Sequence, residues 1–440
     1  MFNTIKNALK TPDVRRRLLF TLLLIIVFRL GCFISVPGID PSQLKPNETD
    51  GIKGLINLLT GGAFTRLSVF AMSITPYITA SIVIQLLGMV IPSLEKLTKE
   101  GGELERAKIN RYTKILTLFL SLAEGVGIYL MYKPVFINPG FLTGFLVVLS
   151  FMTGTAILMW LGEQITSKGI GNGISMIIFV GIVAGLGNGA KSLYNTVFGT
   201  AFDTKNLLLV LGIIVGVLLL VAAVVFVQQA ERRIPVQYSK KVVGRKMVGG
   251  QNTHIPLKLA MAGVMPIIFA SSFMTFPAMV IQLINPNIVT QTTGIQNFWR
   301  IVYNTSIATS SSDVSMKYTV VNAIIYVLLI VGFTFFYTYA TFNPAEISSS
   351  IKKNGGFIPG IRTGKSTTEY LSSVITKLTI FGGFFLAMIA IIPMLFSHIP
   401  QLASIAFGGT SILIVVGVAL ETVQQLESQV AMKHYKGFLE

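Results

Sequence analysis

The segment "SITPYITASIVIQLL", from Ser73 to Leu87, combines a long apolar run with a proline and hydroxyl side chains at its start. Proline has a fixed φ and no backbone N–H, so it suits the first turn of a helix and disrupts a helix interior. The segment therefore predicts a helix that begins close to Pro76. Apolar segments lie on both sides of it in the sequence, so we expect this helix to begin inside a membrane.

Similar apolar runs recur along the whole chain. Its 440 residues are 52% hydrophobic and only 12% charged, and the mean hydropathy is +0.70. Such a composition excludes a soluble monomer and predicts an all-α membrane protein. Ten runs approach the roughly 20 residues that a membrane-spanning helix needs. They lie near 18–36, 74–92, 112–132, 145–165, 172–190, 206–228, 260–284, 318–340, 372–396 and 405–427.

The basic residues predict the orientation of these spans. Successive connecting segments between the spans lie on opposite sides of the membrane. Of the 35 Lys and Arg residues, 26 lie on or beside the segments of one side and eight lie on those of the other side. The first of these sides includes the N-terminal segment 1–17 and the C-terminal tail 428–440. Because cytoplasmic loops carry an excess of Lys and Arg, we expect both termini to be cytoplasmic. The first run is too long for a cleaved signal peptide, so we expect it to remain as a helix.

The chain carries little that could support redox, metal or ion-coupling chemistry. Its single cysteine, Cys32, excludes an internal disulfide, and its three histidines have no metal-binding spacing, so we expect no metal and no cofactor. Few ionisable residues fall within the runs. We expect Arg29 to pair or to reach the membrane surface, and Glu163 and Glu421 to be paired or helix-end charges. Glu124 is the candidate for a buried carboxyl group.

Two pairs of segments repeat within the chain. The pattern P-x-I-x-A-S occurs at Pro76–Ser81 and again at Pro266–Ser271. "GISMIIFVG", from Gly173, resembles "GTSILIVVG", from Gly409, and "GIGNG" before the first of these predicts a tight turn between packed helices. Both repeats are offset by five spans, which predicts inverted halves at 18–190 and 191–427 with a functional site where they meet.

An amphipathic stretch that is too short to span lies before the second run. It covers Gly51 to Ser73 and contains Gly61 and Gly62, which can end a helix and act as a hinge. We expect a short helix that leads into the second span. A helix on the outer membrane surface is the alternative.

These segments resemble the SecY family, the channel subunits of the bacterial Sec protein translocase. The resemblance runs from "RRRLLFTLLLIIVFRLG" through "LTGGAFTRLSVFAMSITPYITASIVIQLL" and "WLGEQITSKGIGNGISMIIF" to "FNPAEISSSIKKNGGFIPGIRTGKSTTEYL" and "FGGTSILIVVGVALE". It implies two pseudo-symmetric five-helix halves around a central pore, with a short plug helix. It also implies a channel that passes unfolded secretory polypeptides and releases transmembrane segments into lipid.

The resemblance assigns a role to six isoleucines that would otherwise be ordinary core residues. The implied pore ring consists of Ile74, Ile78, Ile174, Ile178, Ile268 and Ile414. The internal repeats pair Ile78 with Ile268 and Ile178 with Ile414. A ring of such side chains would seal against ions without binding any particular polypeptide.

The resemblance also implies a plug and a lateral gate. The plug covers about 54–66 and includes Leu55, Ile56, Leu58, Leu59, Gly61, Gly62 and Arg66. The gate would place Thr79, Ser81 and Gln85 opposite Ser271 and Ser272, with Glu124 nearby. Hydrogen bonds that hold these helices together are the alternative role of the hydroxyl groups. If Glu124 faces the gate, we expect it to be protonated or exposed to water.

Two connecting loops are longer than the topology requires. Loop 228–258 carries seven Lys and Arg residues and a strand-like alternation, and loop 343–370 surrounds Arg362. Loops of this length are usually functional. The resemblance implies that Arg245, Lys246 and Arg362 bind the SecA motor ATPase and the ribosome, including ribosomal RNA, whose phosphates suit basic loops.

The resemblance further implies SecE and SecG subunits, a location in the bacterial plasma membrane, and no enzyme activity in this chain. One alternative class is a secondary transporter, which shares inverted repeats but requires ionisable or coordinating groups at mid-membrane. Another is an insertase that only places helices in lipid, which would need an open groove and no plug.

Overall fold

The protein is mostly helical, and a helix lies at each of the ten predicted spans. The computed structural model describes residues 9–40, 60–99, 102–198, 204–238, 241–243, 246–248, 252–284, 295–307, 316–396 and 409–436. The ten helices are α2 (Pro12–Gly31), α4 (Thr75–Val90), α6 (Glu103–Met131), α7 (Phe141–Lys168), α8 (Gly173–Phe198), α9 (Thr204–Gln229), α10 (Met265–Ile284), α12 (Met316–Thr341), α14 (Lys365–Phe396) and α16 (Gly409–Lys436). The predicted ten-helix architecture is confirmed.

Two helix ends lie several residues inside the predicted spans because the chain turns there. The first run was expected to continue to residue 36, but α2 ends at Gly31, and Ser35 forms a β-bridge with Ser68. The seventh run was expected from residue 260, but α10 begins at Met265 after a turn at 259–264. An apolar run measures hydrophobic length, and it does not reveal where the backbone leaves the helix.

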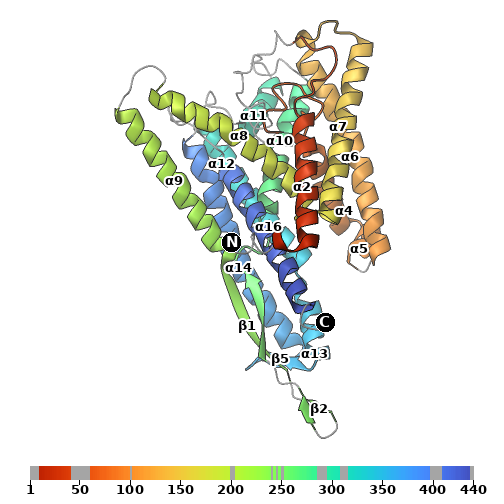
Figure 1. Ribbon diagram of the computed structural model, residues 1–440, viewed down its shortest axis with the longest axis vertical. Coiled ribbons are helices and arrows are strands. Elements are labelled where there is room, and N and C mark those ends of the chain that lie inside the picture. Colours follow the sequence, from red (N-terminus) through yellow and green to blue (C-terminus); the bar gives the residue numbers. More distant parts are fainter. Residues whose placement is uncertain are drawn as a thin grey trace.

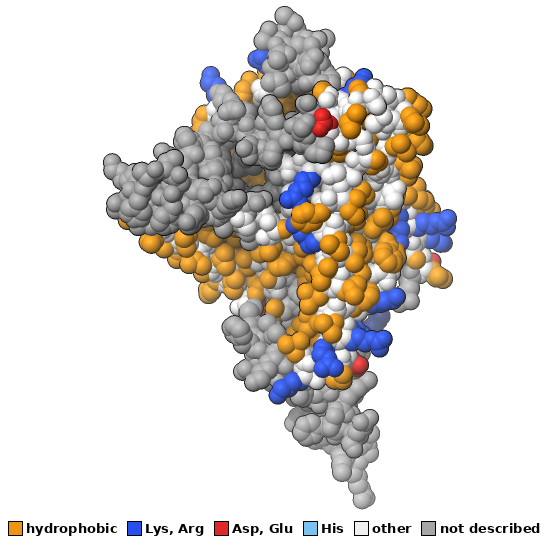
Figure 2. Space-filling view, turned by 45° about the horizontal axis from the view of Figure 1, so that its top comes forward, with side chains coloured by type: hydrophobic (Ala, Val, Ile, Leu, Met, Phe, Trp, Pro, Cys, Tyr) orange, Lys and Arg blue, Asp and Glu red, His pale blue; other side chains and the backbone are white. Residues whose placement is uncertain are grey.

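The outer surface of the helices is apolar, as a lipid environment requires. Six described helical segments are long and apolar enough to cross a membrane, and apolar stretches of α4, α8 and α10 are shorter. On α9, Leu211, Leu218 and Leu219 are each more than half exposed. Figure 2 shows hydrophobic side chains over much of the described surface in its view. The protein therefore spans a membrane with its apolar side chains turned outward.

The helices pack around two apolar cores that adjoin each other. One core lies mainly among α10, α12, α14 and α16, and the other lies among α2, α4, α7, α8, α10 and α16. Ile78 and Met265 pack against both cores. Helix α16 contacts α2 and α8 as well as α9 and α14 (Figure 1). The starts of α4 and α10 thus lie where the two cores meet.

Shorter elements complete the helical body. They are α5 (Pro92–Lys99), the 3-10 helix η2 (Lys133–Val135), α11 (Ile295–Ile307) and α13 (Pro344–Lys353). Residues 61–74 form successive turns instead of a helix. Backbone hydrogen bonds from Val36 to Leu67 and from Val69 to Ile34 attach these turns to the end of α2. Phe64 and Leu67 are fully buried there.

A small β-sheet projects from one end of the helical body (Figure 1). Its strands are β1 (Glu231–Tyr238), β4 (Asn252–Lys258) and β5 (Gly356–Phe357), in the antiparallel order β4-β1-β5, and β2 (Lys241–Val243) pairs with β3 (Lys246–Val248). Ile234 and Val236 are buried between exposed neighbours. The strand-like alternation predicted in loop 228–258 is therefore confirmed.

Candidate functional site

The helices α4 and α10 begin with the same backbone conformation. Ser73 has φ +50° and Gly263 has φ +58°. Each residue donates its N–H to the carbonyl three residues earlier, Phe70 at 2.9 Å and Ala260 at 3.1 Å. The helix then begins two residues later, with its proline at the second position. The sequence similarity of these two starts thus extends to their geometry, and it brings Ile78 and Ile268 to equivalent positions.

The start of α8 is fixed by a tight turn after α7, as the "GIGNG" motif predicted. The side-chain oxygen of Asn172 accepts hydrogen bonds from the N–H groups of Ile174 (3.1 Å) and Ser175 (3.4 Å). A Cβ atom on Gly173 would lie 1.9 Å from the carbonyl oxygen of Gly162. The two helices can approach this closely only because residue 173 has no side chain. This turn places Ile174 and Ile178 on the inner side of α8.

The structure brings all six candidate isoleucines into one apolar cluster. Ile74, Ile178, Ile268 and Ile414 are at most 6% exposed and belong to the same core. Ile78 and Ile174 pack against that core. They come from the region just before α4 and from α4, α8, α10 and α16. Residues from four helices that are far apart in the sequence therefore meet at one place.

A cavity of about 160 Å³ lies beside this cluster. Four of the isoleucines line it, and the remaining lining residues come from α4, the α7–α8 turn, α8, α10 and α12. The described lining residues are Tyr77, Ile78, Ser81, Gln85, Asn172, Ile174, Ser175, Ile178, Met265, Ile268, Phe269 and Tyr337. The lining combines apolar side chains with uncharged polar groups. Among the described lining residues, such a surface provides no charged binding site.

The candidate gate residues lie on α4 and α10, which contact each other. Ser81 and Gln85 line the cavity and are joined by a 2.9 Å hydrogen bond. The hydroxyl of Thr79 donates to the Thr75 carbonyl, and that of Ser271 donates to the Ile268 carbonyl. These hydrogen bonds all remain within one helix. Ser272 is half-buried on α10.

Glu124 lies inside a predicted span, as expected. It is 7% exposed on α6, a helix that contacts both α4 and α10. Thr117 and Ser121 are also buried on α6, and their hydroxyl groups donate to carbonyls of the same helix. A row of buried polar groups therefore follows α6 toward Glu124.

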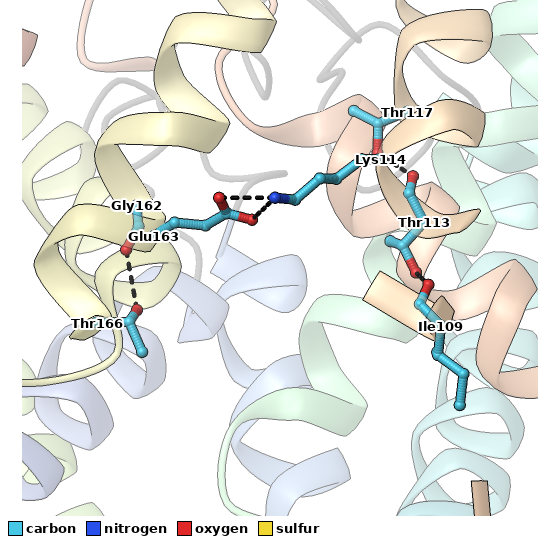
Figure 3. Close-up of polar contacts among 7 residues, drawn as sticks. All are labelled: Ile109, Thr113, Lys114, Thr117, Gly162, Glu163 and Thr166. Carbon is cyan, nitrogen blue, oxygen red and sulfur yellow. Dashed lines mark hydrogen bonds and ion pairs between the residues drawn. The ribbon is translucent and has the colours of Figure 1, made fainter. Parts of the chain in front are cut away.

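Glu163 and Arg29 each interact with a polar partner, as the sequence predicted. The Nζ of Lys114 on α6 lies 2.6 Å from one carboxylate oxygen of Glu163 on α7 and 2.8 Å from the other (Figure 3). Both side chains are about 40% exposed, so the pair contributes at most about 1 kcal/mol. The guanidinium of Arg29 donates to the Gly61 carbonyl at 3.3 Å.

Only part of the candidate plug can be placed. Leu55, Ile56, Leu58 and Leu59 lie outside the described residues. Gly61 and Gly62 have φ values of +61° and +90°, and a Cβ atom on Gly61 would lie 2.6 Å from the Gly181 carbonyl oxygen of α8. Arg66 is exposed and lies 4.4 Å from the centre of the Phe33 ring.

The two candidate docking loops form one structural unit. Strand β5 of the second loop pairs with β1 of the first, with Gln237 opposite Phe357. Buried side chains of β1 and β4 pack against α13, the following loop and α14. Arg362 is exposed between β5 and α14, and its carbonyl accepts a hydrogen bond from Thr367. Arg245 lies outside the described residues, and for Lys246 only the backbone in β3 is described.

The structure adds residues that the sequence analysis did not select. Val264 stands in the same place before α10 as Ile74 does before α4, and it is 2% exposed in the same core. The offset between the two P-x-I-x-A-S motifs could have identified it. Phe269 and Tyr337 line the cavity, and no motif indicated them, because their position follows from the packing of α10 against α12.

Comparison with known proteins gives consistent matches along the chain. The SecY family model matches residues 68–423. Two relatives are described as protein translocase subunit SecY. The protein of Halalkalibacterium halodurans is 43% identical to this chain and that of Bacillus subtilis is 41% identical, in each case over 450 residues that cover all of both chains. The Thermus thermophilus protein is 41% identical over 450 residues and covers all of this chain and 98% of the relative.

Solved structures share the fold at lower sequence identity. A structure described as a protein-conducting channel has a TM-score of 0.64 and 20% identity, covering 94% of this chain and 91% of the other. Sec61 in the canine ribosome–channel complex from the endoplasmic reticulum has a TM-score of 0.59 and 19% identity over the same shares of the two chains. The family match, the identity over the full length and the shared fold agree, and the chain belongs to the SecY family.

Proposed function

We propose that this protein is the protein-conducting channel of a Sec translocase. It would pass unfolded secretory polypeptides across the membrane and release transmembrane segments sideways into lipid. The observation that carries the proposal is the convergence of the six isoleucines, from four helices, beside a cavity with an uncharged lining. The chain itself is not an enzyme, so the energy for transport must come from a partner.

The isoleucine cluster would act as a seal that recognises no particular sequence. Isoleucine side chains offer no hydrogen bonds, and a narrow apolar constriction loses its water and resists ions. The same side chains can pack around any residue of an extended polypeptide. A channel for many different proteins needs both properties at its narrowest point.

The alternative transporter function is not favoured. A secondary transporter needs ionisable or coordinating groups at its substrate site, and the lining residues that the structure describes include no Asp, Glu, Lys, Arg or His. Two inverted halves, a plug at about 54–66 and a gate between α4 and α10 belong to the proposed channel. An insertase, which would only place helices in lipid and would have no plug, remains the alternative to a channel with a plug.

The projecting sheet supports a docking role at one membrane surface. We place it in the cytoplasm of a bacterium, together with both termini, because the basic residues concentrate on that side. The proposed partners are SecE and SecG within the membrane, and the SecA motor or the ribosome at the loops. Among the structural relatives, Sec61 is found in a ribosome–channel complex. The exposed position of Arg362 fits such a contact.

Crosslinking to a stalled secretory chain tests the conducting role. Single cysteines are introduced at Ile78, at Ile268 and, as a control, at Leu218 on the outer surface of α9, after Cys32 is replaced by alanine. We expect crosslinks at positions 78 and 268 and none at 218. Translocation of the chain without crosslinks at 78 and 268 would refute the assigned path.

Charge reversal at Arg362 tests the docking role. Arg362→Glu should reduce motor-driven export into vesicles by at least tenfold, because it places a negative charge where a partner contact is proposed. Lys133→Glu, at an exposed position in η2 outside the two loops, provides a control for charge. Normal export by Arg362→Glu would contradict the docking role but not the channel.

A further inference from the structure

Helix α11 has no part in the proposed conduction path. It covers 13 residues, Ile295–Ile307, which corresponds to roughly 20 Å at 1.5 Å per residue. This length is too short to cross the roughly 30 Å hydrocarbon core of a membrane. The helix connects α10 with α12 in the sequence and contacts both. It lies at the end of the molecule opposite the sheet (Figure 1), and so at one membrane surface.

The second half of α11 is firmly attached to the membrane-spanning helices. Tyr303, Thr305 and Ser306 are between 7% and 8% exposed. The side-chain amide of Asn322 on α12 donates to the Thr305 carbonyl at 2.5 Å. The neighbouring Val321 is 46% exposed on the outer surface of α12. The attachment therefore lies beside the lipid-facing surface, near the beginning of α12.

The first half of α11 is exposed although it is apolar. Phe298 is 60% exposed, Trp299 is 47% exposed and Ile301 is 42% exposed. The Phe298 and Trp299 rings contact each other edge to face at 5.6 Å. Trp and other amphipathic aromatic side chains concentrate where a membrane meets water. Lipid next to α12 can cover these three side chains without any further protein.

Arg300 lies between Trp299 and Ile301 in the sequence and is half-buried. Its Nε is buried and has no hydrogen-bond partner within the described residues. The sequence of α11 contains this one Arg and no Asp or Glu. A buried guanidinium N–H without an acceptor is unfavourable, and phosphate oxygens match the planar guanidinium well.

We propose that α11 is a lipid-binding helix at the membrane interface. Phe298, Trp299 and Ile301 lie among the upper parts of the acyl chains, and Arg300 binds the phosphate of an anionic phospholipid headgroup. The exposed half of α11 thereby continues the lipid-contacting surface of α12. The partner is the bilayer itself.

Spin labelling measures the depth of α11 in the membrane. A nitroxide is attached at Ile301→Cys in the Cys32→Ala chain, and the complex is reconstituted into vesicles of phosphatidylglycerol and phosphatidylcholine. Leu328→Cys, 66% exposed within α12, provides the reference inside the membrane, and Thr363→Cys provides the aqueous one. Accessibility to oxygen and to a water-soluble nickel complex gives the depth of each label.

We expect the label at 301 to lie roughly 5–10 Å below the headgroup level and to be shallower than the label at 328. Accessibility to the nickel complex equal to that at position 363 would overturn the proposal. So would protection from both reagents, because another protein would then cover the helix.

A second comparison tests Arg300 itself. In vesicles of phosphatidylcholine alone, the label at 301 should be more mobile than in vesicles that contain phosphatidylglycerol. Arg300→Gln should abolish this difference, and Arg300→Lys should retain at least half of it because it keeps the positive charge. Added inorganic phosphate should not change the mobility difference between the two kinds of vesicle. A difference that persists in Arg300→Gln would exclude the headgroup contact.

Discussion

Two contacts within the helical body differ in kind. The front seam is the contact of α4 with α10 beside the cavity. The rear junction is the contact of the turn 169–172 with α2 and α16. At the rear junction, the N–H of Gly171 donates to the side chain of Gln425 at 2.6 Å, and the N–H of Ile170 donates to the hydroxyl of Thr21 at 3.1 Å. At the front seam, the hydrogen bonds of Thr79, Gln85 and Ser271 remain within their own helices.

This difference predicts which contact opens more easily. When two apolar helix faces separate in a membrane, lipid replaces the lost contacts at little cost. When backbone N–H groups lose their acceptors in the same environment, each unsatisfied group costs several kcal/mol. We therefore expect the front seam to open during gating while the rear junction stays closed.

The largest effect is expected from a bulky side chain in the rear junction. A Cβ atom on Gly169 would lie 2.4 Å from the Thr21 hydroxyl and 2.7 Å from the Ile165 carbonyl oxygen. Gly169→Val should therefore lower the stability of the protein by roughly 3 kcal/mol, measured as the thermal unfolding midpoint in detergent. The matched control is Gly216→Val on α9, where an added Cβ atom would have no neighbouring side chain or backbone from another part of the protein within 4 Å. Equal unfolding midpoints for Gly169→Val and Gly216→Val would show that the rear junction can move apart to accommodate the larger side chain.

Opening the apolar cluster at the front should change conduction. Serine at both Ile78 and Ile268 removes apolar side chains from α4 and α10, lets water enter the constriction and should raise the resting ion conductance at least severalfold. Planar bilayers that contain the resting complex measure this current. Ile324→Ser on the outer surface of α12, which is 56% exposed, should leave the current unchanged. A double variant with unchanged resting current would rule out the seal.

Removing one hydrogen bond from the rear junction should have a moderate effect. Gln425→Ala leaves the N–H of Gly171 without its acceptor, and we expect a loss of about 1–3 kcal/mol in stability. Gln425→Glu keeps an acceptor oxygen and should retain most of the stability. If both variants unfold at the native midpoint, the hydrogen bond does not hold the rear junction together.

The smallest effect is expected at the start of α4, where the front seam begins. Ser73 has φ +50°, whereas Gly263 occupies the equivalent place before α10. Residues with a side chain lose roughly 1–2 kcal/mol in this conformation, so Ser73→Gly should stabilise the protein by up to about 1 kcal/mol. Gly263→Ser should destabilise it by a similar amount. A lower unfolding midpoint for Ser73→Gly, or a higher one for Gly263→Ser, would break the proposed equivalence of the two helix starts.

Much of the helical architecture could be predicted from the sequence, because each span is a local property. A run of about 20 apolar residues must cross the membrane as a helix. Pro76 and Pro266 marked two helix starts for an equally local reason. The turn at 169–172 and the strand at Ile234–Val236 were also visible in their residue patterns. The pore ring, in contrast, was selected through a family resemblance, since isoleucine in an apolar run carries no signal of its own.

The sequence by itself determined the class of the protein, its ten helices and the two repeated helix starts. Only the tertiary structure decided that Gln425 holds Gly171, that β5 joins β1, and that Tyr337 lies beside the isoleucines. Hydrophobic length and backbone preference act on neighbouring residues and can be read along the chain. Contacts between residues hundreds of positions apart depend on how the completed helices pack against one another, and no local pattern records that packing.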